Sequence, residues 1–383
     1  MPRKSNARRK DGLIPVQVYL GRVDGKRKYR TVYGKTQKEA DKKAEELKMR
    51  LGTGVDLLSE NTPFEVYREQ WLARKKDAVS AGTYPSYESH ANALKALDKV
   101  PVCKIQEHHI QAIIDDLAAK NPRTGKPTSK KTLNNIKKAA VGILGIAHRK
   151  RLVYFNEAEG VEVARSAPKS NRRALSKEEM KRVEDTPHRA QTAAMIMMYA
   201  GLRRGEMSAL RWSDINLKAA TIGVTNSVEF VGNKSYIKEG TKTAAGARVV
   251  HIPQRLIVYL CQQPRSLGLI ISKGDGGAMT NEAWRKLWSS YMHALNMKYG
   301  KFIKKPQRGD GKPPMMIQPF GCHDLRHTFA TILYHSGVDV LTARDQLGHA
   351  DVQTTIGIYT HLDKQFKERK MQQLDTYLNE FAS

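Results

Sequence analysis

The sequence predicts a multidomain α+β chain with three parts: a small N-terminal three-stranded sheet with one helix, a helical bundle, and a mixed, mainly helical domain with a small antiparallel sheet. Three observations support this prediction. Short strand patterns lie in a basic N-terminal segment, apolar stripes at helical spacing follow, and helix and strand patterns then alternate. These periodicities are the main sequence signals of helices and strands. We expect domains at residues 1–55, 60–165 and 174–383.

Composition restricts the class of protein. The 383 residues are 40% hydrophobic and 27% charged, as in globular proteins, and the formal net charge is +28. Such an excess of positive charge indicates a polyanionic partner, most commonly a nucleic acid. The longest apolar run, residues 193–202, is shorter than the ~20 residues that cross a membrane, and no signal peptide pattern follows the basic N-terminus. The three scattered cysteines predict no disulfide framework, which favours the cytoplasm.

The N-terminal segment combines a high positive charge with strand patterns. Residues 1–50 carry sixteen Lys and Arg against six Asp and Glu. Residues 16–20 and 28–33 have strand patterns, and a capping box at Thr36 and Glu39 predicts a helix that runs to about residue 51. A basic sheet backed by a helix can enter a DNA groove. The alternative is a solvated basic tail that only adds positive charge.

Four apolar stripes predict the helical bundle. Their members recur at helical spacing in four successive segments: Phe64, Tyr67, Trp71 and Leu72; Tyr84, Tyr87, Ala91 and Leu94; Ile110, Ile113, Ile114 and Leu117; Leu133, Ile136, Ala140, Ile143 and Ala147. Such stripes are typical of helix faces that pack on one another. Residues 165–173, rich in Ser, Pro, Asn and basic side chains, then predict a linker.

The third domain begins with an apolar helix that ends in a pair of arginines. After residue 200 the chain reads Gly-Leu-Arg-Arg-Gly-Glu. An arginine at the end of an apolar helix is costly unless it meets an anion, and Glu206 is the local partner of Arg203. Strand patterns follow at residues 221–229, 236–238 and 248–252. A basic turn between the last two contains Lys242.

Residues 323–359 hold the densest group of chemically active side chains. A helix that begins at His323 would place His323, Arg326 and His327 on one face. A planar cation beside imidazoles that exchange protons near neutral pH suits a phosphate. Tyr359 would supply a nucleophile. A zinc site is the alternative, but zinc hydrolases need Glu where Asp324 stands, and no third ligand is evident, so we expect neither a metal nor a cofactor.

Six residues together resemble the signature of the tyrosine recombinase family. They are Arg203, Lys242, His323, Arg326, His349 and Tyr359. The motifs that carry the resemblance are Ala-Gly-Leu-Arg-Arg-Gly-Glu at 200–206, His-Asp-Leu-Arg-His-Thr at 323–328, Leu-Gly-His at 347–349 and Ile-Tyr-Thr-His at 358–361. The chain resembles integrases of temperate phages and conjugative transposons, and the resemblance covers all three predicted domains.

The resemblance implies how the domains and partners are organised. Residues 1–55 would bind arm-type DNA sites, residues 60–165 would bind core sites, and residues 174–383 would be catalytic. Double-stranded DNA with both kinds of attachment site would be the substrate, bound by a homotetramer. DNA-bending accessory proteins and an excisionase are candidate partners. The protein would act in the cytoplasm of a bacterial host and would be associated with the nucleoid when bound to DNA. No membrane partner is expected.

The resemblance and the chemistry together imply a role for each residue. Tyr359 would attack the phosphodiester and form a 3′-phosphotyrosine, with His323 as its base. Lys242 would protonate the leaving 5′-oxygen, although Lys238 competes for this role. Arg203, Arg326 and His349 would bind the phosphate. Glu206 and His327 would support them. Gly357 would weaken the helix before the nucleophile by about 1 kcal/mol relative to alanine.

Three other interpretations of these motifs stay open. A type IB topoisomerase-like enzyme uses the same residue types to nick and reseal one duplex, but it has no need of the N-terminal basic sheet. A resolvase-type recombinase would act on core sites only. A non-catalytic DNA-binding regulator would have no use for the tyrosine.

Overall fold

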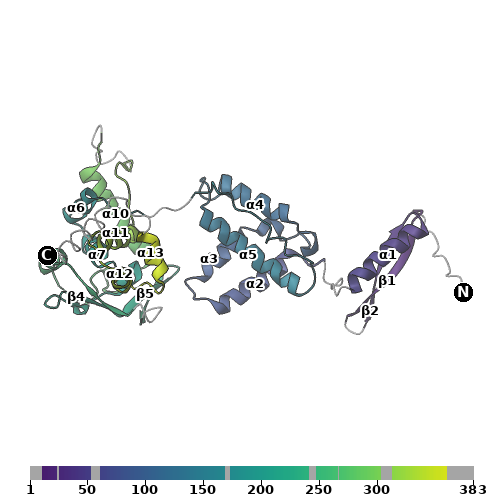
Figure 1. Cartoon of the computed structure of the whole chain (residues 1–383), viewed down its shortest axis with the longest axis horizontal. Helices are drawn as coiled ribbons and strands as arrows, with labels where there is room; N and C mark the ends of the chain where they lie inside the picture. The colour runs from purple at the N-terminus through teal and green to yellow at the C-terminus, as the bar shows by residue number, and fades with distance from the viewer. Residues whose placement is uncertain are drawn as a thin grey trace, which may run out of the picture. The chain divides into compact units, whose positions relative to one another are not determined.

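The computed structural model describes residues 11–23, 26–52, 61–168, 173–240, 247–265, 267–302 and 313–359. The chain divides into two compact units, Met1–Ser170 and Asn171–Ser383 (Figure 1). The two N-terminal segments that the sequence predicts as domains both fall in the first unit. Each of them has its own cluster of buried apolar side chains.

The N-terminal segment is a β-hairpin covered by one helix. Strands β1 (Ile14–Val23) and β2 (Lys26–Gly34) pair antiparallel, with an irregularity at Tyr19 and Gly21, and α1 (Gln37–Gly52) packs on one face. The predicted capping box forms only in part. The Glu39 amide donates to Thr36 Oγ1, but the Glu39 carboxylate accepts from the Lys35 amide, one residue before the position that the reciprocal bond requires. The sequence predicted three strands. The part of the chain that is described here has two, because only two extended segments pair.

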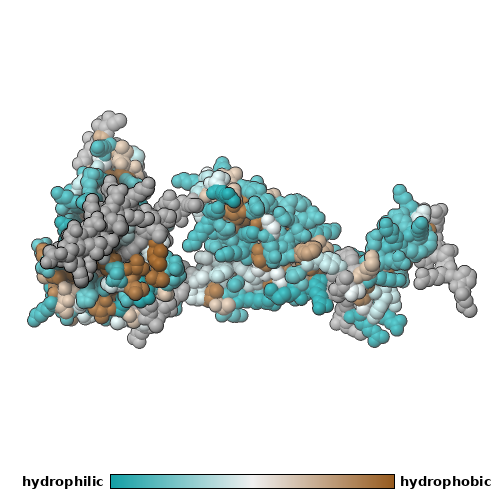
Figure 2. Space-filling model, in the orientation of Figure 1, coloured by the Kyte–Doolittle hydropathy of each residue, from teal (hydrophilic) through white to brown (hydrophobic). Residues whose placement is uncertain are grey.

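The second segment is a bundle of four helices: α2 (Phe64–Ala78), α3 (Tyr84–Asn92), α4 (Glu107–Ala119) and α5 (Lys130–Arg149). The four predicted stripes form its core, and the central positions Phe64, Ile110 and Ile143 are fully buried. Arg68 is also buried, where it forms a two-pronged ion pair with Asp98 at 2.7 and 2.9 Å. The face of this four-helix bundle seen in Figure 2 is mainly hydrophilic, as expected when the apolar stripes face inward.

The second unit combines helices with small antiparallel sheets. Its helices are α6 (Lys177–Glu184), α7 (Gln191–Ala200), α8 (Arg204–Ala209), α9 (Gln254–Cys261), α10 (Asn281–Tyr299), α11 (Cys322–His335), α12 (Val340–Leu347) and α13 (Val352–Tyr359). One sheet has the order β3 (Ile215–Asn216), β4 (Thr221–Val224), β7 (Arg248–His251), and the other pairs β5 (Asn226–Val231) with β6 (Lys234–Glu239). This architecture confirms the predicted fold class.

Helix α7 lies at the centre of this unit. Every residue from Ala193 to Ala200 is buried, and α11 packs directly against it. The first turn of α11 and the chain that leaves α7 are therefore held in a fixed relation by the core. None of the described helices is long and apolar enough to cross a membrane.

Candidate active site

A sharp turn after α7 presents the first arginine. Gly201 ends the helix in the left-handed region at φ 66°, and a Cβ built on it would lie 2.3 Å from the Phe329 ring, so only glycine fits there. Arg203 then caps α8. Its amide donates to Glu206 Oε2 at 2.9 Å and its guanidinium donates to Glu206 Oε1 at 2.6 Å. The local ion pair expected from the sequence is thus present.

Glu206 also binds a second arginine, which the sequence did not reveal. Arg248, at the start of β7, donates to both carboxylate oxygens, at 3.2 and 3.0 Å. Both side chains are almost fully buried. Arg248 lies far from Glu206 in sequence and begins an ordinary strand pattern, so no local signal marks it.

Arg326 contributes a third guanidinium from α11. It is buried, and it donates to the carbonyl oxygens of Gly201 at 2.6 Å and Leu347 at 2.5 Å. Within the described residues it forms no ion pair with a carboxylate. Burial lowers the pKa of Arg326 to about 9, and the positive charge of Arg203 acts in the same direction. The group therefore stays protonated at neutral pH.

The end of α12 gathers the three arginines. Consecutive carbonyls at 346, 347 and 348 accept hydrogen bonds from Arg248 at 3.0 Å, Arg326 at 2.5 Å and Arg203 at 2.6 Å, respectively. The last carbonyls of a helix lack partners within it and carry the negative end of the helix dipole, so they suit cations. Gly348 makes this turn possible at φ 64°, and a Cβ there would lie 2.8 Å from the Arg248 guanidinium.

The charge of this cluster is strongly unbalanced. Burial favours the neutral acid, but hydrogen bonds and charge from Arg248, with those from Arg203, outweigh it and lower the pKa of Glu206 to about 2. This ionised carboxylate pairs with Arg203 and Arg248, while Arg326 donates to backbone carbonyls. The described site residues therefore carry more positive than negative charge, with fork-shaped donors suited to the oxygens of a phosphate.

His349 follows the arginine-binding turn. Burial lowers its pKa to about 4, and the charges of Arg326, Arg203 and Arg248 add to the effect, so the imidazole is neutral at pH 7. Its Nδ1 lies 2.9 Å from Oγ1 of Thr355, a fully buried residue on α13. A neutral imidazole with one nitrogen held in this way can offer its other nitrogen to a ligand.

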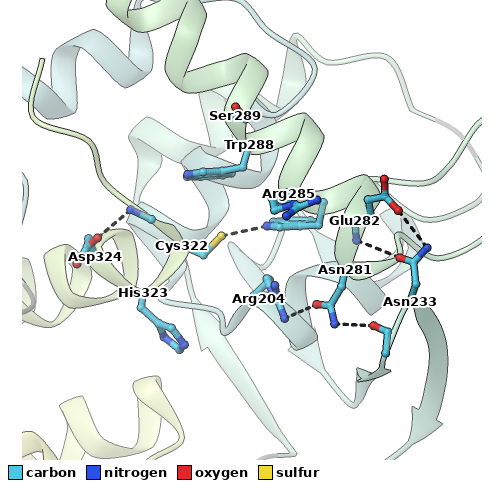
Figure 3. A pocket seen from close by; sticks show the side chains of 13 residues that line it. Arg204, Asn233, Asn281, Glu282, Arg285, Trp288, Ser289, Cys322, His323 and Asp324 are labelled. Carbon is cyan, nitrogen blue, oxygen red and sulfur yellow. Dashed lines mark hydrogen bonds between the residues drawn. The ribbon is translucent and has the colours of Figure 1, made fainter. Parts of the chain in front are cut away.

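His323 lies in the first turn of α11, beside a pocket of about 950 Å³ (Figure 3). The imidazole is exposed. Two hydrogen bonds join other residues that line this pocket. Arg204 donates to Asn281 Oδ1 at 3.0 Å, and the Trp284 indole donates to Sγ of Cys322, the residue before His323, at 3.3 Å. His323 precedes Arg326 by one helical turn. Among the described residues, the pocket is lined by Arg204 and Arg285, and Arg203, Arg248 and Arg326 do not line it.

The structure thus brings Arg203, Glu206, Arg326 and His349 together, with His323 one turn away. His327 lies on α11 between buried neighbours and is partly buried. Tyr359 is the last residue of α13 and the last residue described, while Lys242 lies outside the described residues. In the described part of the chain, no group of three or more His, Cys, Asp or Glu side chains is arranged to hold a metal ion.

Comparison with known proteins places this chain in a family. Residues 173–365, just over half of the chain, match the phage integrase family. A XerC-like tyrosine recombinase of Caldanaerobacter subterraneus subsp. tengcongensis is 25% identical over 381 residues, which cover 94% of this chain and 95% of that protein.

Two solved structures show the same fold. The Tn1549 transposon integrase in complex with a circular intermediate DNA has a TM-score of 0.62 at 18% identity, over 82% of this chain and 99% of that one. A lambda integrase tetramer bound to a Holliday junction has a TM-score of 0.52 at 17% identity, over 92% and 96% of the two chains.

Proposed function

The chain belongs to the phage integrase family of tyrosine recombinases, and we propose that it integrates and excises a mobile element, such as a phage or conjugative transposon. It would cut and rejoin DNA at specific sites through a 3′-phosphotyrosyl intermediate. The observation that carries the proposal is the arginine cluster. Arg203 and Arg326 meet at the turn before His349, and Tyr359 lies on the helix that follows this turn.

The two arginines would bind the scissile phosphate. A phosphodiester resists attack because its non-bridging oxygens are negatively charged, and preorganised donors stabilise the charge that builds up in the transition state. With a pKa of about 9, Arg326 is protonated at neutral pH. Neutral His349 would add a hydrogen bond to the same oxygens. Glu206 and Arg248 hold Arg203 in place, and we assign His327 a supporting role on α11.

The transfer of the phosphoryl group requires two proton movements. A tyrosine hydroxyl is almost wholly protonated at neutral pH, so Tyr359 needs a base, and His323 would take that proton. The Tyr359 oxygen would form a bond to phosphorus while the bond from phosphorus to the 5′-oxygen breaks. Lys242 would donate a proton to that leaving oxygen. A 5′-hydroxyl from a partner duplex would then reverse the steps and complete strand exchange.

The remaining parts of the chain would bind the DNA partners. We assign residues 60–165 to core sites and residues 1–55 to arm-type sites. The solved lambda integrase structure is a tetramer on a Holliday junction, which supports a homotetramer here. DNA-bending proteins and an excisionase are candidate partners of this assembly, which would act on DNA in the cytoplasm of a bacterial host.

A covalent-adduct assay tests the proposal directly. Full-length protein is incubated with nicked core-site DNA taken from the ends of its element, and the products are separated in SDS. We expect an SDS-resistant protein–DNA adduct that Tyr359→Phe abolishes. EDTA should leave the adduct intact, since the proposed chemistry routes no step through a metal. An adduct that persists in Tyr359→Phe would refute the assignment of the nucleophile.

A further inference from the structure

The contact between His349 and Thr355 joins the phosphate-binding turn to the helix of the nucleophile. Thr355 lies on α13 and is 0% exposed, while His349 follows the end of α12. Thr355 and Tyr359 are four residues apart in one helix. They therefore lie on the same face, with a rise of about 6 Å between them. The hydrogen bond at 2.9 Å thus connects two elements that the proposed reaction needs in register.

The direction of this hydrogen bond follows from the need to satisfy buried polar groups. A threonine hydroxyl carries one hydrogen, and a buried hydroxyl that donates to nothing is costly. Among the described residues, the only hydrogen bond of Thr355 Oγ1 is to Nδ1 of His349. The hydroxyl therefore donates and Nδ1 accepts. Because the imidazole is neutral, its proton must lie on Nε2.

This tautomer is the one that a phosphate requires. Neutral histidine has one donor and one acceptor nitrogen, and an acceptor nitrogen would repel a negatively charged oxygen. With Nδ1 occupied by the threonine, Nε2–H is the donor that remains. Arg203 and Arg326 donate to the carbonyls of Gly348 and Leu347, the two residues before His349. All three donors therefore meet at one turn.

We propose that Thr355 is a positioning residue that holds His349 in the Nε2–H tautomer while α13 is docked. A single hydrogen bond would then couple the placement of the nucleophile's helix to the readiness of the phosphate site. The inference rests on the proposed function. Because Thr355 is fully buried, it would act through His349 and not through a contact with the phosphate.

Two substitutions separate the hydroxyl from the shape of the side chain. Thr355→Val replaces the hydroxyl with a methyl group, and Thr355→Ser keeps it. We expect Thr355→Val to slow single-turnover adduct formation on nicked core-site DNA by about tenfold, less than the 10²–10³-fold loss on removal of a whole transition-state donor. Thr355→Ser should stay within about threefold of wild type. DNA affinity, measured by fluorescence anisotropy, should stay within about twofold for both variants.

Two further measurements exclude a merely structural role. In a His349→Ala background, Thr355→Val should cause no additional loss, because the hydroxyl acts only through the imidazole. Nitrogen-15 shifts of histidine-labelled full-length protein should show an Nε2–H tautomer for His349 in wild type and a mixture in Thr355→Val. Equal losses in both backgrounds, an unchanged rate in Thr355→Val, or an unchanged tautomer would overturn the inference. Failure of the wild-type protein to form any adduct would instead refute the proposed function.

Discussion

At the scale of single residues, Glu206 determines the charge balance of the active site. Its carboxylate contacts both Arg203 and Arg248, and it also stabilises Arg326 electrostatically. Its carboxylate holds Arg203 from both the backbone amide and the guanidinium. Without this negative charge, three guanidinium groups would repel one another in a partly dehydrated site. Glu206 therefore allows a cationic site to exist before a phosphate arrives.

We predict that Glu206→Gln destabilises the second unit in a pH-dependent manner. The pKa of Glu206 falls from 4.5 to about 2 on folding. One pKa unit corresponds to about 1.4 kcal/mol, so this shift contributes about 3 kcal/mol. Because the pKa is lowered in the folded state, the contribution is complete above about pH 4.5 and is lost as the pH falls through about 2. Chemical denaturation at several pH values measures the difference between the two proteins.

The matched control for this prediction is Glu178→Gln. Glu178 pairs with Arg182, but its side chain is 75% exposed, and exposed pairs contribute little. This control should change the free energy of unfolding by less than about 1 kcal/mol at any pH. A Glu206→Gln protein as stable as wild type at pH 7 would mean that the arginines find other compensation.

At the scale of secondary structure, the active site depends on how helices end. Helix α7 ends at Gly201 and α12 ends at Gly348, both in the left-handed region. The carbonyls of Gly201 and Leu347, freed at these two ends, accept hydrogen bonds from Arg326. Two tight helix ends thus replace the acidic partners that a buried arginine usually has. This arrangement leaves the cation available for an anionic substrate.

We predict opposite effects for alanine at two glycines. Gly201→Ala should destabilise the protein by more than about 2 kcal/mol, because a non-glycine residue in this conformation costs about 1–2 kcal/mol and its Cβ would overlap the Phe329 ring. Gly357→Ala should increase stability by up to about 1 kcal/mol, because Gly357 lies within α13 with open space around its Cα. Thermal denaturation monitored by circular dichroism compares the two proteins. Destabilisation by Gly357→Ala would show that α13 needs its glycine for another reason.

Local spacing explains which parts of the site could be predicted from the sequence. The pairing of Arg203 with Glu206 and the neighbouring positions of His323 and Arg326 follow from steps of three residues in a helix. Arg248 could not be found in this way, because its partners lie on other elements. Thr355 is only six residues from His349, but their contact depends on the turn between α12 and α13. A hydroxyl in a helix carries no signal of that geometry.

For the fold, as for the site, local patterns were predictable from the sequence and contacts between distant elements were not. The stripes of the bundle are long and regular, so their helices were predicted with the correct buried faces. The hairpin gave only short strand patterns, which fixed the two paired strands but not the number of strands. Packing between distant elements, such as α7 against α11, has no period in the sequence and had to come from the structure.

At the scale of the whole molecule, charge is concentrated in the N-terminal segment. The formal charge of the chain is +28, and sixteen of its 66 Lys and Arg residues lie within residues 1–50. On the hairpin, Arg27 and Lys28 are exposed, and the rings of Tyr19 and Tyr29 lie side by side, 5.4 Å apart, about half exposed. Exposed cations beside aromatic rings suit a nucleic-acid surface. The hydrophobic cluster under this hairpin is separate from those of the rest of the chain.

We predict that deletion of residues 1–55 separates cleavage from recombination. Adduct formation on nicked core-site DNA should remain within about twofold of wild type, while recombination that requires arm-type sites should be severely reduced. The dependence of DNA affinity on salt should also become shallower, since each lost phosphate contact removes about 0.9 from the slope of log affinity against log salt. The control is the full-length variant with Arg27→Ala and Lys28→Ala, which keeps the hairpin but removes two of its exposed cations. A partial defect in recombination by this variant would attribute the loss to DNA contacts. Full recombination by the truncated protein would contradict an arm-binding role for this segment.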